Sequence, residues 1–439
     1  MKHHPVIKRF MFKKLALGLA VATVCGVAEA KSLSEASTLL EAMGNPNESQ
    51  VMKNPGLKMG GWINAGVTYN GTNPEDNFNG PVTFGDRASE FQLNQINFYL
   101  QRAVATEGDA WDFGFRFDVM YGSDAYFTQA YGISPFGELG TDPGEGNPLY
   151  RDGSVDRGSW DLDIIRGRFY NLAIPQAYLE SYIPIGNGLN VKVGHFYTPI
   201  GYETVPAPDN FFYTHAYTMQ FGEPFTHTGI LGNYAINGNW AVMGGAITGS
   251  ATGGWDGSFD QQLGNWGGIM GTTWTSDDKG SSVNVSGTYS GRSEISSDAW
   301  AMYSVVAKHN FTDKLHFVLQ HDHGFADGIS PLNATAPDTE WYGVLTHLTY
   351  DVKDNLTAGI RGEWFRDQNG FRVCTPARTA ASCAPGTYYA ITAGINWKPV
   401  PWLNVRPNVR YDWSTGKNAF DAGNQDQQFL FSTDMNINF

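Results

Sequence analysis

The chain has 439 residues and a formal net charge of −14, and only 16% of its residues are charged, against roughly 25% in soluble proteins. The longest apolar run, Leu15 to Ala28, is shorter than the run of about 18 residues that a membrane helix needs, which excludes a helical membrane protein. Aromatic residues make up 14% of the chain, enough to bury a core, and this excludes a disordered chain. The remaining possibilities are a large soluble β protein and a membrane-spanning β-barrel.

The first thirty residues have the pattern of a secretory signal. Two lysines precede the apolar stretch Leu15 to Ala28, and small residues at Ala28 and Ala30 mark a cleavage site. We therefore predict a signal peptide over residues 1–30, with translation starting at Met1 or Met11. The remainder has 24 basic and 42 acidic residues, a net charge of −18, which argues against a nucleic-acid partner.

Residues 31–57 are expected to form a periplasmic segment ahead of the first strand. Leu33, Ser37, Leu40 and Gly44 fall on one helical row, so we predict a short amphipathic helix between residues 31 and 44. Such a helix could plug or cap the periplasmic mouth of a barrel, or merely lead into the first strand. We favour a segment that merely leads into the first strand.

Period-two alternation is the main pattern of the rest of the chain. Residues 111–121 place apolar side chains on one face: Trp111, Phe113, Phe115, Phe117, Val119 and Tyr121. Residues 403–413 alternate in the same way, and their second face holds no apolar residue: Asn404, Arg406, Asn408, Arg410 and Asp412. Each such strand therefore has one apolar and one polar face.

Sixteen segments of this kind can be recognised, starting near residues 58, 90, 111, 169, 188, 226, 240, 265, 282, 299, 315, 340, 356, 388, 402 and 428. They last about ten to twelve residues, as a tilted strand needs to cross a bilayer, whereas globular strands average about five or six. Short links such as 183–188 alternate with long ones such as 122–168. A soluble sandwich also shows period-two alternation but has no reason to separate loop lengths in this way.

We therefore predict an all-β fold, a transmembrane antiparallel β-barrel of about 16 strands over residues 58–439, with short periplasmic turns and long extracellular loops. In hydrocarbon every backbone amide needs a partner within the protein, so the sheet must close, and a barrel of this size encloses a water-filled channel. The predicted location is the cell outer membrane, with membrane lipid around the apolar face. Phe439 is expected to be the C-terminal signal for the barrel-assembly machinery.

The most specific motifs lie between residues 194 and 229. Residues 194–203 read GHFYTPIGYE, residues 206–213 read PAPDNFFY and residues 224–229 read PFTHTG. Together with PQAY at residues 175–178, these motifs resemble the OmpL-like β-barrel porin family (porin-2), over roughly residues 61–439. The resemblance implies an outer-membrane barrel that serves as a diffusion channel.

The third long loop, residues 198–225, is expected to fold inward, because prolines stiffen it and its aromatic side chains need a surface to cover. Its acids are Glu203, Asp209 and Glu223, and the basic residues on polar strand faces include Arg116, Lys192, Arg361, Arg406 and Arg410. We predict a pore constriction in which loop acids oppose wall cations, since rings of charge set selectivity in pores. In the alternative, the acids are solvated and the arginines pair with wall acids such as Asp118, Glu363 and Asp412.

Cysteines and histidines suggest further sites. Cys374 and Cys383 lie nine positions apart in a loop of an exported chain, and we predict a local disulfide, because a metal site would need more ligands. Four histidines with Asp322 could form a metal or hydrolytic site: His316, His321, His323 and His347. No serine nucleophile motif accompanies them, so we predict no enzyme, no catalytic residue, no metal and no cofactor.

Three more histidines, His195, His215 and His227, flank the inward loop, and for these we favour structural hydrogen bonds over a pH gate. The predicted function is an outer-membrane porin, in which small hydrophilic solutes or ions diffuse passively through a barrel narrowed by the third loop. The alternative is a surface adhesin or interaction barrel with an occluded pore, whose second loop at residues 122–168 binds a partner. The patterns do not decide the solute, the ion preference, or whether the chain is a monomer or a homo-oligomer.

Overall fold

The computed structural model describes residues 31–130, 160–161, 164–165, 167, 169–248, 266–290, 300–326, 338–373 and 385–439. The predicted signal peptide, most of the second long loop, and both Cys374 and Cys383 lie outside these residues. No helix among the described residues is long and apolar enough to cross a membrane.

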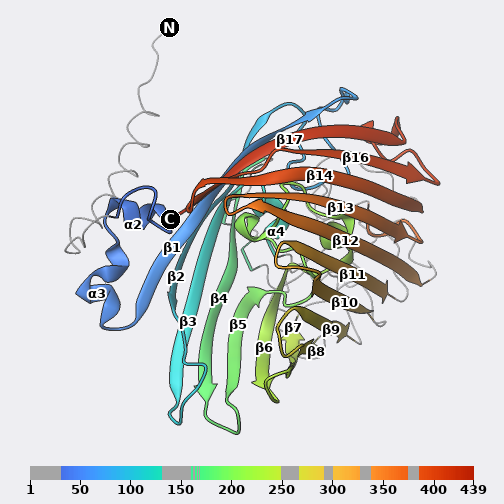
Figure 1. Ribbon diagram of the computed structural model, residues 1–439. Coiled ribbons are helices and arrows are strands. Elements are labelled where there is room, and N and C mark those ends of the chain that lie inside the picture. Colours follow the sequence, from blue (N-terminus) through green and yellow to red (C-terminus); the bar gives the residue numbers. More distant parts are fainter. Residues whose placement is uncertain are drawn as a thin grey trace.

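Seventeen strands in the described part of the chain form one sheet (Figure 1). They are β1 (Leu57–Asn70), β2 (Phe91–Arg102), β3 (Asp112–Gly122), β4 (Asn171–Ile183), β5 (Leu189–Tyr197), β6 (Thr226–Ala235), β7 (Trp240–Thr248), β8 (Gly267–Thr275), β9 (Ser281–Ser290), β10 (Trp300–Asn310), β11 (Leu315–Ala326), β12 (Thr339–Lys353), β13 (Leu356–Asp367), β14 (Gly386–Val400), β15 (Leu403–Val405), β16 (Asn408–Thr415) and β17 (Gln427–Asn438). All named pairs are antiparallel, and β1 pairs with both β2 and β17, so the sheet closes into a barrel.

Two of these strands are pieces of a single crossing strand. Both β15 and β16 pair with β14 on one side and β17 on the other. They are separated by Arg406 and Pro407, and a proline cannot donate a ladder hydrogen bond. The barrel is therefore sixteen-stranded, as predicted from the sequence, and every predicted strand start lies within two residues of the observed one.

Alternation along the strands sorts apolar side chains outward and polar ones inward. Phe113, Ile360 and Phe429 are among many large apolar side chains exposed on the strands, whereas Gln95 and Asp118 are fully buried. This arrangement is the reverse of a soluble protein and suits a barrel whose outer face meets hydrocarbon. The polar interior holds the inserted loops described below.

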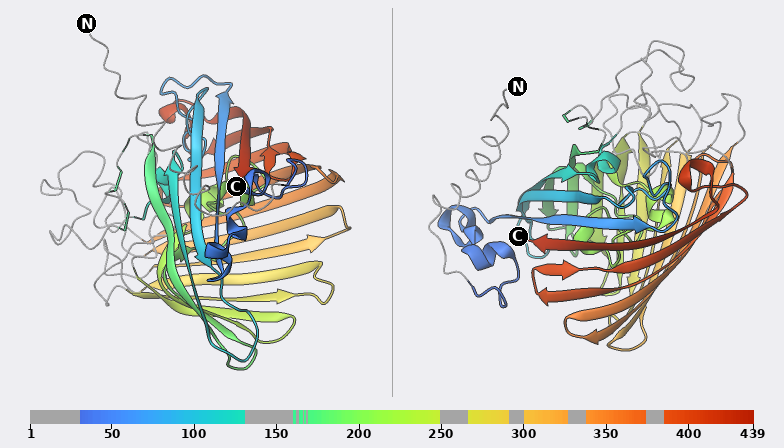
Figure 2. Two further views of the ribbon diagram at one scale, coloured as in Figure 1. Left: turned by 90° about the vertical axis from the view of Figure 1, so that its left-hand side faces the viewer. Right: turned by 90° about the horizontal axis from the view of Figure 1, so that it is seen from above.

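The N-terminal segment lies beside the barrel rim, outside its wall (Figure 2). It contains helices α2 (Leu39–Met43) and α3 (Gln50–Lys53), with the 3-10 turn η1 (Pro46–Glu48) between them. Trp402 Nε1 donates to the carbonyl of Leu33 at 2.8 Å, and Asn47 Nδ2 donates to the carbonyl of Met59 at 2.9 Å. These bonds fasten the segment to the end of the barrel that carries the chain's C-terminus.

Long connections enter the barrel from the opposite end. The third loop contains the 3-10 turn η3 (Ala207–Asp209) and the π-helical turn η4 (Thr218–Gly222). Helix α4 (Ala125–Thr128) lies beside it within the barrel, while the 3-10 turn η6 (Asp421–Gly423) lies between β16 and β17 (Figure 1). Two clusters of buried apolar residues join these segments to the inner wall, one around Tyr217 and Phe221 and one around Phe84 and Phe127.

Candidate functional site

The third loop, between β5 and β6, is packed inside the barrel. Its aromatic side chains Phe212, Tyr213, Tyr217 and Phe221 are all at most 3% exposed. Burying such side chains against the wall and α4 removes from water the apolar surface that would destabilise a loop extended into solvent. The loop is therefore packed against the inner wall of the barrel.

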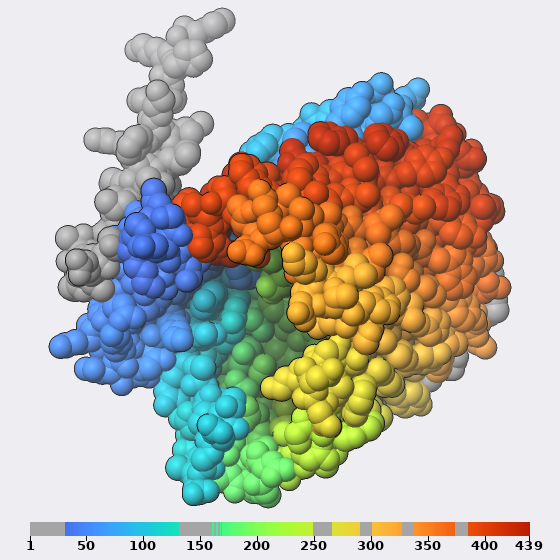
Figure 3. Space-filling model, in the orientation of Figure 1, coloured from blue at the N-terminus to red at the C-terminus, as the bar shows by residue number. Residues whose placement is uncertain are grey.

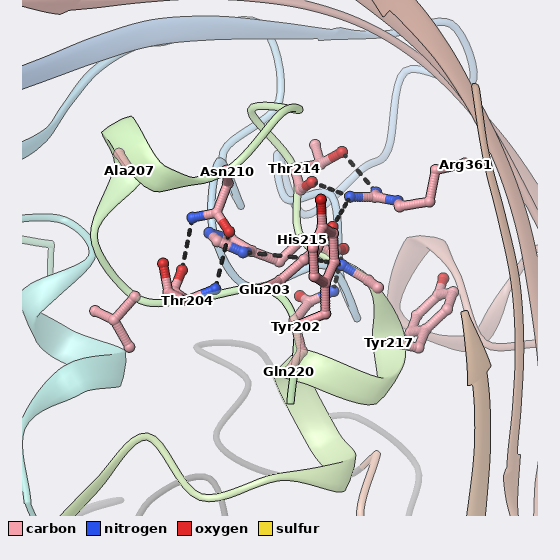
Figure 4. Close-up of polar contacts among 12 residues, drawn as sticks. Tyr202, Glu203, Thr204, Ala207, Asn210, Thr214, His215, Tyr217, Gln220 and Arg361 are labelled. Atoms are coloured by element: carbon pink, nitrogen blue, oxygen red, sulfur yellow. Dashed lines mark hydrogen bonds and ion pairs between the residues drawn. The ribbon is translucent and has the colours of Figure 1, made fainter. Parts of the chain in front are cut away.

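Glu203 connects the third loop to the inner face of β12 and β13 (Figure 4). Its Oε1 accepts from Arg361 Nη1 at 2.7 Å and pairs with His347 Nε2 at 3.2 Å. Its Oε2 accepts from the Ala216 amide at 2.7 Å and lies 3.6 Å from His215 Nδ1. Burial raises the pKa of Glu203, but Arg361 and the two imidazoles outweigh this and hold the pKa well below its ordinary value.

Two more wall arginines hold the backbone of the loop. Arg406 Nη1 donates to the carbonyls of Ala207 at 2.8 Å and Asn210 at 2.6 Å, and Arg410 Nη1 donates to the carbonyl of His215 at 2.9 Å. Like Arg361, both arginines are at most 1% exposed. These three predicted pore cations are therefore buried anchors of the loop.

Each of these anchors also pairs with an acid on the wall. Arg361 Nε donates to Glu363 Oε1 at 2.8 Å, and the guanidinium of Arg410 lies 2.8 Å from Asp412 and 3.1 Å from Glu363. Arg406 pairs with Asp434. Arg361 thus pairs with a loop acid and a wall acid together.

Uncharged side chains of β2 hold the opposite edge of the loop. Gln95 Oε1 accepts from the Ala207 amide at 3.0 Å, and Gln95 Nε2 donates to the Val205 carbonyl at 2.9 Å. Tyr213 Oη donates to Asn94 Oδ1 at 2.8 Å. These residues were not predicted from the sequence, although the amide-rich run from Gln92 to Asn97 in a predicted strand could have indicated them.

Glu223 occupies a different environment from the other loop acids. Gln320 Nε2 donates both to Glu223 Oε1 and, at 2.7 Å, to Asp322 Oδ2, and Thr218 also donates to Asp322. Burial raises the pKa of Glu223 well above its ordinary value, and the neighbouring Asp322 raises it further. None of the predicted wall cations forms a described ion pair with Glu223, so this acid serves the attachment of the loop to β11.

Of the predicted constriction residues, only Asp209, Arg116 and Lys192 are not buried. Asp209 is exposed at the edge of the loop, beside a cavity of about 230 Å³ that Tyr197 and Thr204 also line. Desolvation by the surrounding barrel atoms raises the pKa of Asp209 above its ordinary value, and the charge of Arg116 offsets part of this rise. Arg116 and Lys192 are half-buried on the wall opposite and form no described ion pair with a loop acid.

The wall cations that border the lumen lie over tyrosine rings. Arg116 binds Asp118 through two hydrogen bonds of 2.7 and 3.0 Å, with its guanidinium 4.4 Å from the centre of the Tyr99 ring. Lys192 Nζ lies 4.8 Å from the centre of the Tyr178 ring. A similar contact that the sequence analysis missed places Lys308 Nζ 4.9 Å from the Tyr202 ring.

Residues 56–439 match the model of the family described as "Putative beta-barrel porin-2, OmpL-like". The chain belongs to this family of porins. Among curated proteins none matches the chain. The family and the fold together identify an outer-membrane β-barrel porin, so the resemblance found in the sequence is confirmed.

Solved structures of outer-membrane channels share the fold of this porin. OprB of Pseudomonas putida superposes with a TM-score of 0.55 at 14% identity, covering 94% of this chain and 100% of OprB. An anion-selective porin from Comamonas acidovorans superposes with a TM-score of 0.54 at 9% identity, covering 87% of this chain and 99% of that porin. The outer-membrane channel DcaP of Acinetobacter baumannii superposes with a TM-score of 0.51 at 13% identity, covering 87% of this chain and 97% of DcaP.

The four histidines considered from the sequence for a metal or hydrolytic site do not meet at a single place. His316 pairs with Asp351 at 3.1 Å near a short turn, His347 contacts Glu203 in the lumen, and His321 and His323 flank Tyr303. Across the described ranges no group of three or more His, Cys, Asp or Glu side chains could hold a metal ion.

Two of the histidines that flank the third loop, and the C-terminal residue, are held by hydrogen bonds. His195 Nδ1 pairs with Thr228 Oγ1 at 2.7 Å, and His227 Nε2 pairs with Thr198 Oγ1 at 3.0 Å. Phe439 exchanges backbone hydrogen bonds of 2.8 and 2.9 Å with Gly61, at the seam where the barrel closes. Recognition of Phe439 by assembly machinery stays a prediction.

Proposed function

We propose that this porin lets small hydrophilic solutes and ions diffuse through the space between the exposed edge of the third loop and the wall formed by β3 to β5. The observation that carries the proposal is the asymmetric attachment of the loop. Its buried side is fastened by Arg361, Arg406 and Arg410, whereas Asp209 is exposed opposite Arg116. Viewed as in Figure 3, the barrel is hollowed between its cyan and green strands and its yellow strands.

The third loop is proposed to be a fixed constriction. Removing one partner of a buried ion pair costs about 3–5 kcal/mol, because the remaining charge stays buried without compensation. Loop opening would have to break the Glu203–Arg361 pair together with the bonds from Arg406 and Arg410. Solutes would accordingly be selected by the size and charge of the permanent gap.

We further propose that the channel performs no covalent chemistry and needs no cofactor. Diffusion through a water-filled pore requires only a fixed wall and suitable charges. Contact of the outer face with membrane lipid follows from the exposed apolar strand faces. Assembly by the barrel machinery and formation of a homo-oligomer are also proposed.

Planar-bilayer recording of the purified protein tests this function. We expect discrete conductance steps, and we expect Asp209→Asn to move the reversal potential in a potassium chloride gradient toward anions. The matched control is Asp313→Asn, which removes the same charge from an exposed short turn. Absence of any conductance would overturn the pore, and equal reversal potentials for wild type and Asp209→Asn would remove Asp209 from the constriction.

A further inference from the structure

Two opposite charges face each other on adjacent strands of the lumen wall without forming an ion pair. Glu180 of β4 and Lys192 of β5 are direct partners in the strand register. In the described part of the chain, no carboxylate oxygen lies within 4.0 Å of Lys192 Nζ, and neither side chain forms a described hydrogen bond. Both side chains are half-buried, so solvent in the lumen reaches them.

Directly opposed residues of opposite charge normally attract each other, since their Cβ atoms are about 5 Å apart. Tyr178 provides the reason that these do not meet. It lies on the same inward face of β4 as Glu180, and its ring holds the ammonium of Lys192 at 4.8 Å from the ring centre. A cation–π contact of this kind contributes about 0.5–1 kcal/mol, comparable with an exposed ion pair.

We propose that Glu180, Lys192 and Tyr178 form a subsite for small zwitterionic solutes of the α-amino acid type. An α-amino acid carries a carboxylate and an ammonium on neighbouring atoms, so it can meet Lys192 and Glu180 at the same time. A solute with one charge satisfies one side chain and meets like charge at the other. The inference rests on the proposed pore function and adds a solute class to it.

The other charged side chains near this pair have partners of their own, so Glu180 and Lys192 are the two opposite charges that a dipolar solute would meet here. Arg116, the register partner of Tyr178, is already bound at two positions by Asp118. Asp209 lies at the edge of the third loop and its charge interacts with Arg116. Neither residue supplies an unpaired ammonium beside an unpaired carboxylate on neighbouring strands.

Alanine and lactamide provide a direct test, because they are isomers of the same size, one zwitterionic and one neutral. Swelling of liposomes containing the full mature protein reports the entry of each solute. Lys192→Met and Glu180→Gln each remove one charge contact, worth up to about 1 kcal/mol. The alanine-to-lactamide rate ratio of the wild type should therefore be up to about fivefold higher than the ratio of either variant. Lys279→Met and Asp313→Asn remove equivalent charges at short turns and should leave the ratio unchanged.

Changing the tyrosine distinguishes a subsite from the mere presence of two charges. In Tyr178→Leu both charges remain, but Lys192 is free to pair with Glu180, so the preference for alanine should fall. Tyr178→Phe keeps the ring and should keep the preference. Swelling with neither solute would overturn the pore itself. Swelling with both, at a ratio insensitive to Lys192→Met and Glu180→Gln, would overturn the subsite alone.

Discussion

Arg361 of β13 donates to Glu203 of the third loop across 2.7 Å, although 158 residues separate them along the chain. Both side chains are at most 4% exposed, and Arg361 also donates to the carbonyl of Thr214 at 2.6 Å. One guanidinium therefore fixes two parts of the same loop. Because the pair is shielded from water, its attraction is screened far less by salt than that of a surface ion pair.

Replacing Arg361 with methionine should destabilise the barrel and loosen the loop. The substitution leaves Glu203 and Glu363 buried without their shared cation, and the expected loss in free energy of unfolding is about 3–5 kcal/mol. Urea unfolding from lipid vesicles would measure the loss, and single-channel recordings should show noisier currents. Arg366→Met is the control, since Arg366 is half-buried and donates to Gln368 at 2.8 Å. Equal stability of the two variants would contradict the anchoring role.

Rising pH should loosen the other end of the loop. The pKa of Glu223 is raised in the folded protein, mainly by burial and further by Asp322. A raised pKa means that the folded state binds the proton more tightly, so this stabilisation is complete below the ordinary glutamate pKa and is lost as pH rises through the raised value. Channel current at a fixed salt concentration should accordingly become larger or noisier as the solution is made alkaline.

Glu223→Gln should flatten this pH dependence, because an amide keeps the hydrogen-bonding shape of the protonated acid and cannot ionise. Glu340→Gln serves as control, since Glu340 lies on β12 and contacts Tyr342 rather than the loop. Persistence of the full alkaline effect in Glu223→Gln would assign the pH response to another group.

The strands could be predicted from the sequence because period-two alternation is a local property. Phe113 and Asp118 can be assigned to opposite faces without knowing their neighbours. The contacts of Arg361 could not be predicted in this way, since strand faces give direction but not the partner that a loop brings from elsewhere. The same limit applies to Gln95, whose bonds to Val205 and Ala207 span 110 and 112 residues.

Deleting residues 31–55 should leave single-channel conductance unchanged. The described segment lies beside the rim, with the Leu33 carbonyl bound by Trp402 Nε1, and does not enter the lumen (Figure 2). Bilayer recordings of the deletion variant beside the full mature chain would test this. A conductance increase in the deletion would show that the segment reaches the mouth of the pore.

Gly201→Ala should disturb the loop where it passes Glu223. Gly201 has a φ of +89°, which L-residues with side chains rarely adopt, and a methyl group there would collide with the Glu223 carboxyl group. Displacing Glu223 would break its bond to Gln320, so we expect lower stability, by roughly 1–3 kcal/mol, and an altered conductance. Gly238→Ala is a matched control, because no heavy atom beyond Gly238 and its two chain neighbours would lie within 4 Å of the added methyl group. If both alanine variants unfold and conduct like the wild type, the tight passage at Gly201 does not hold the loop in place.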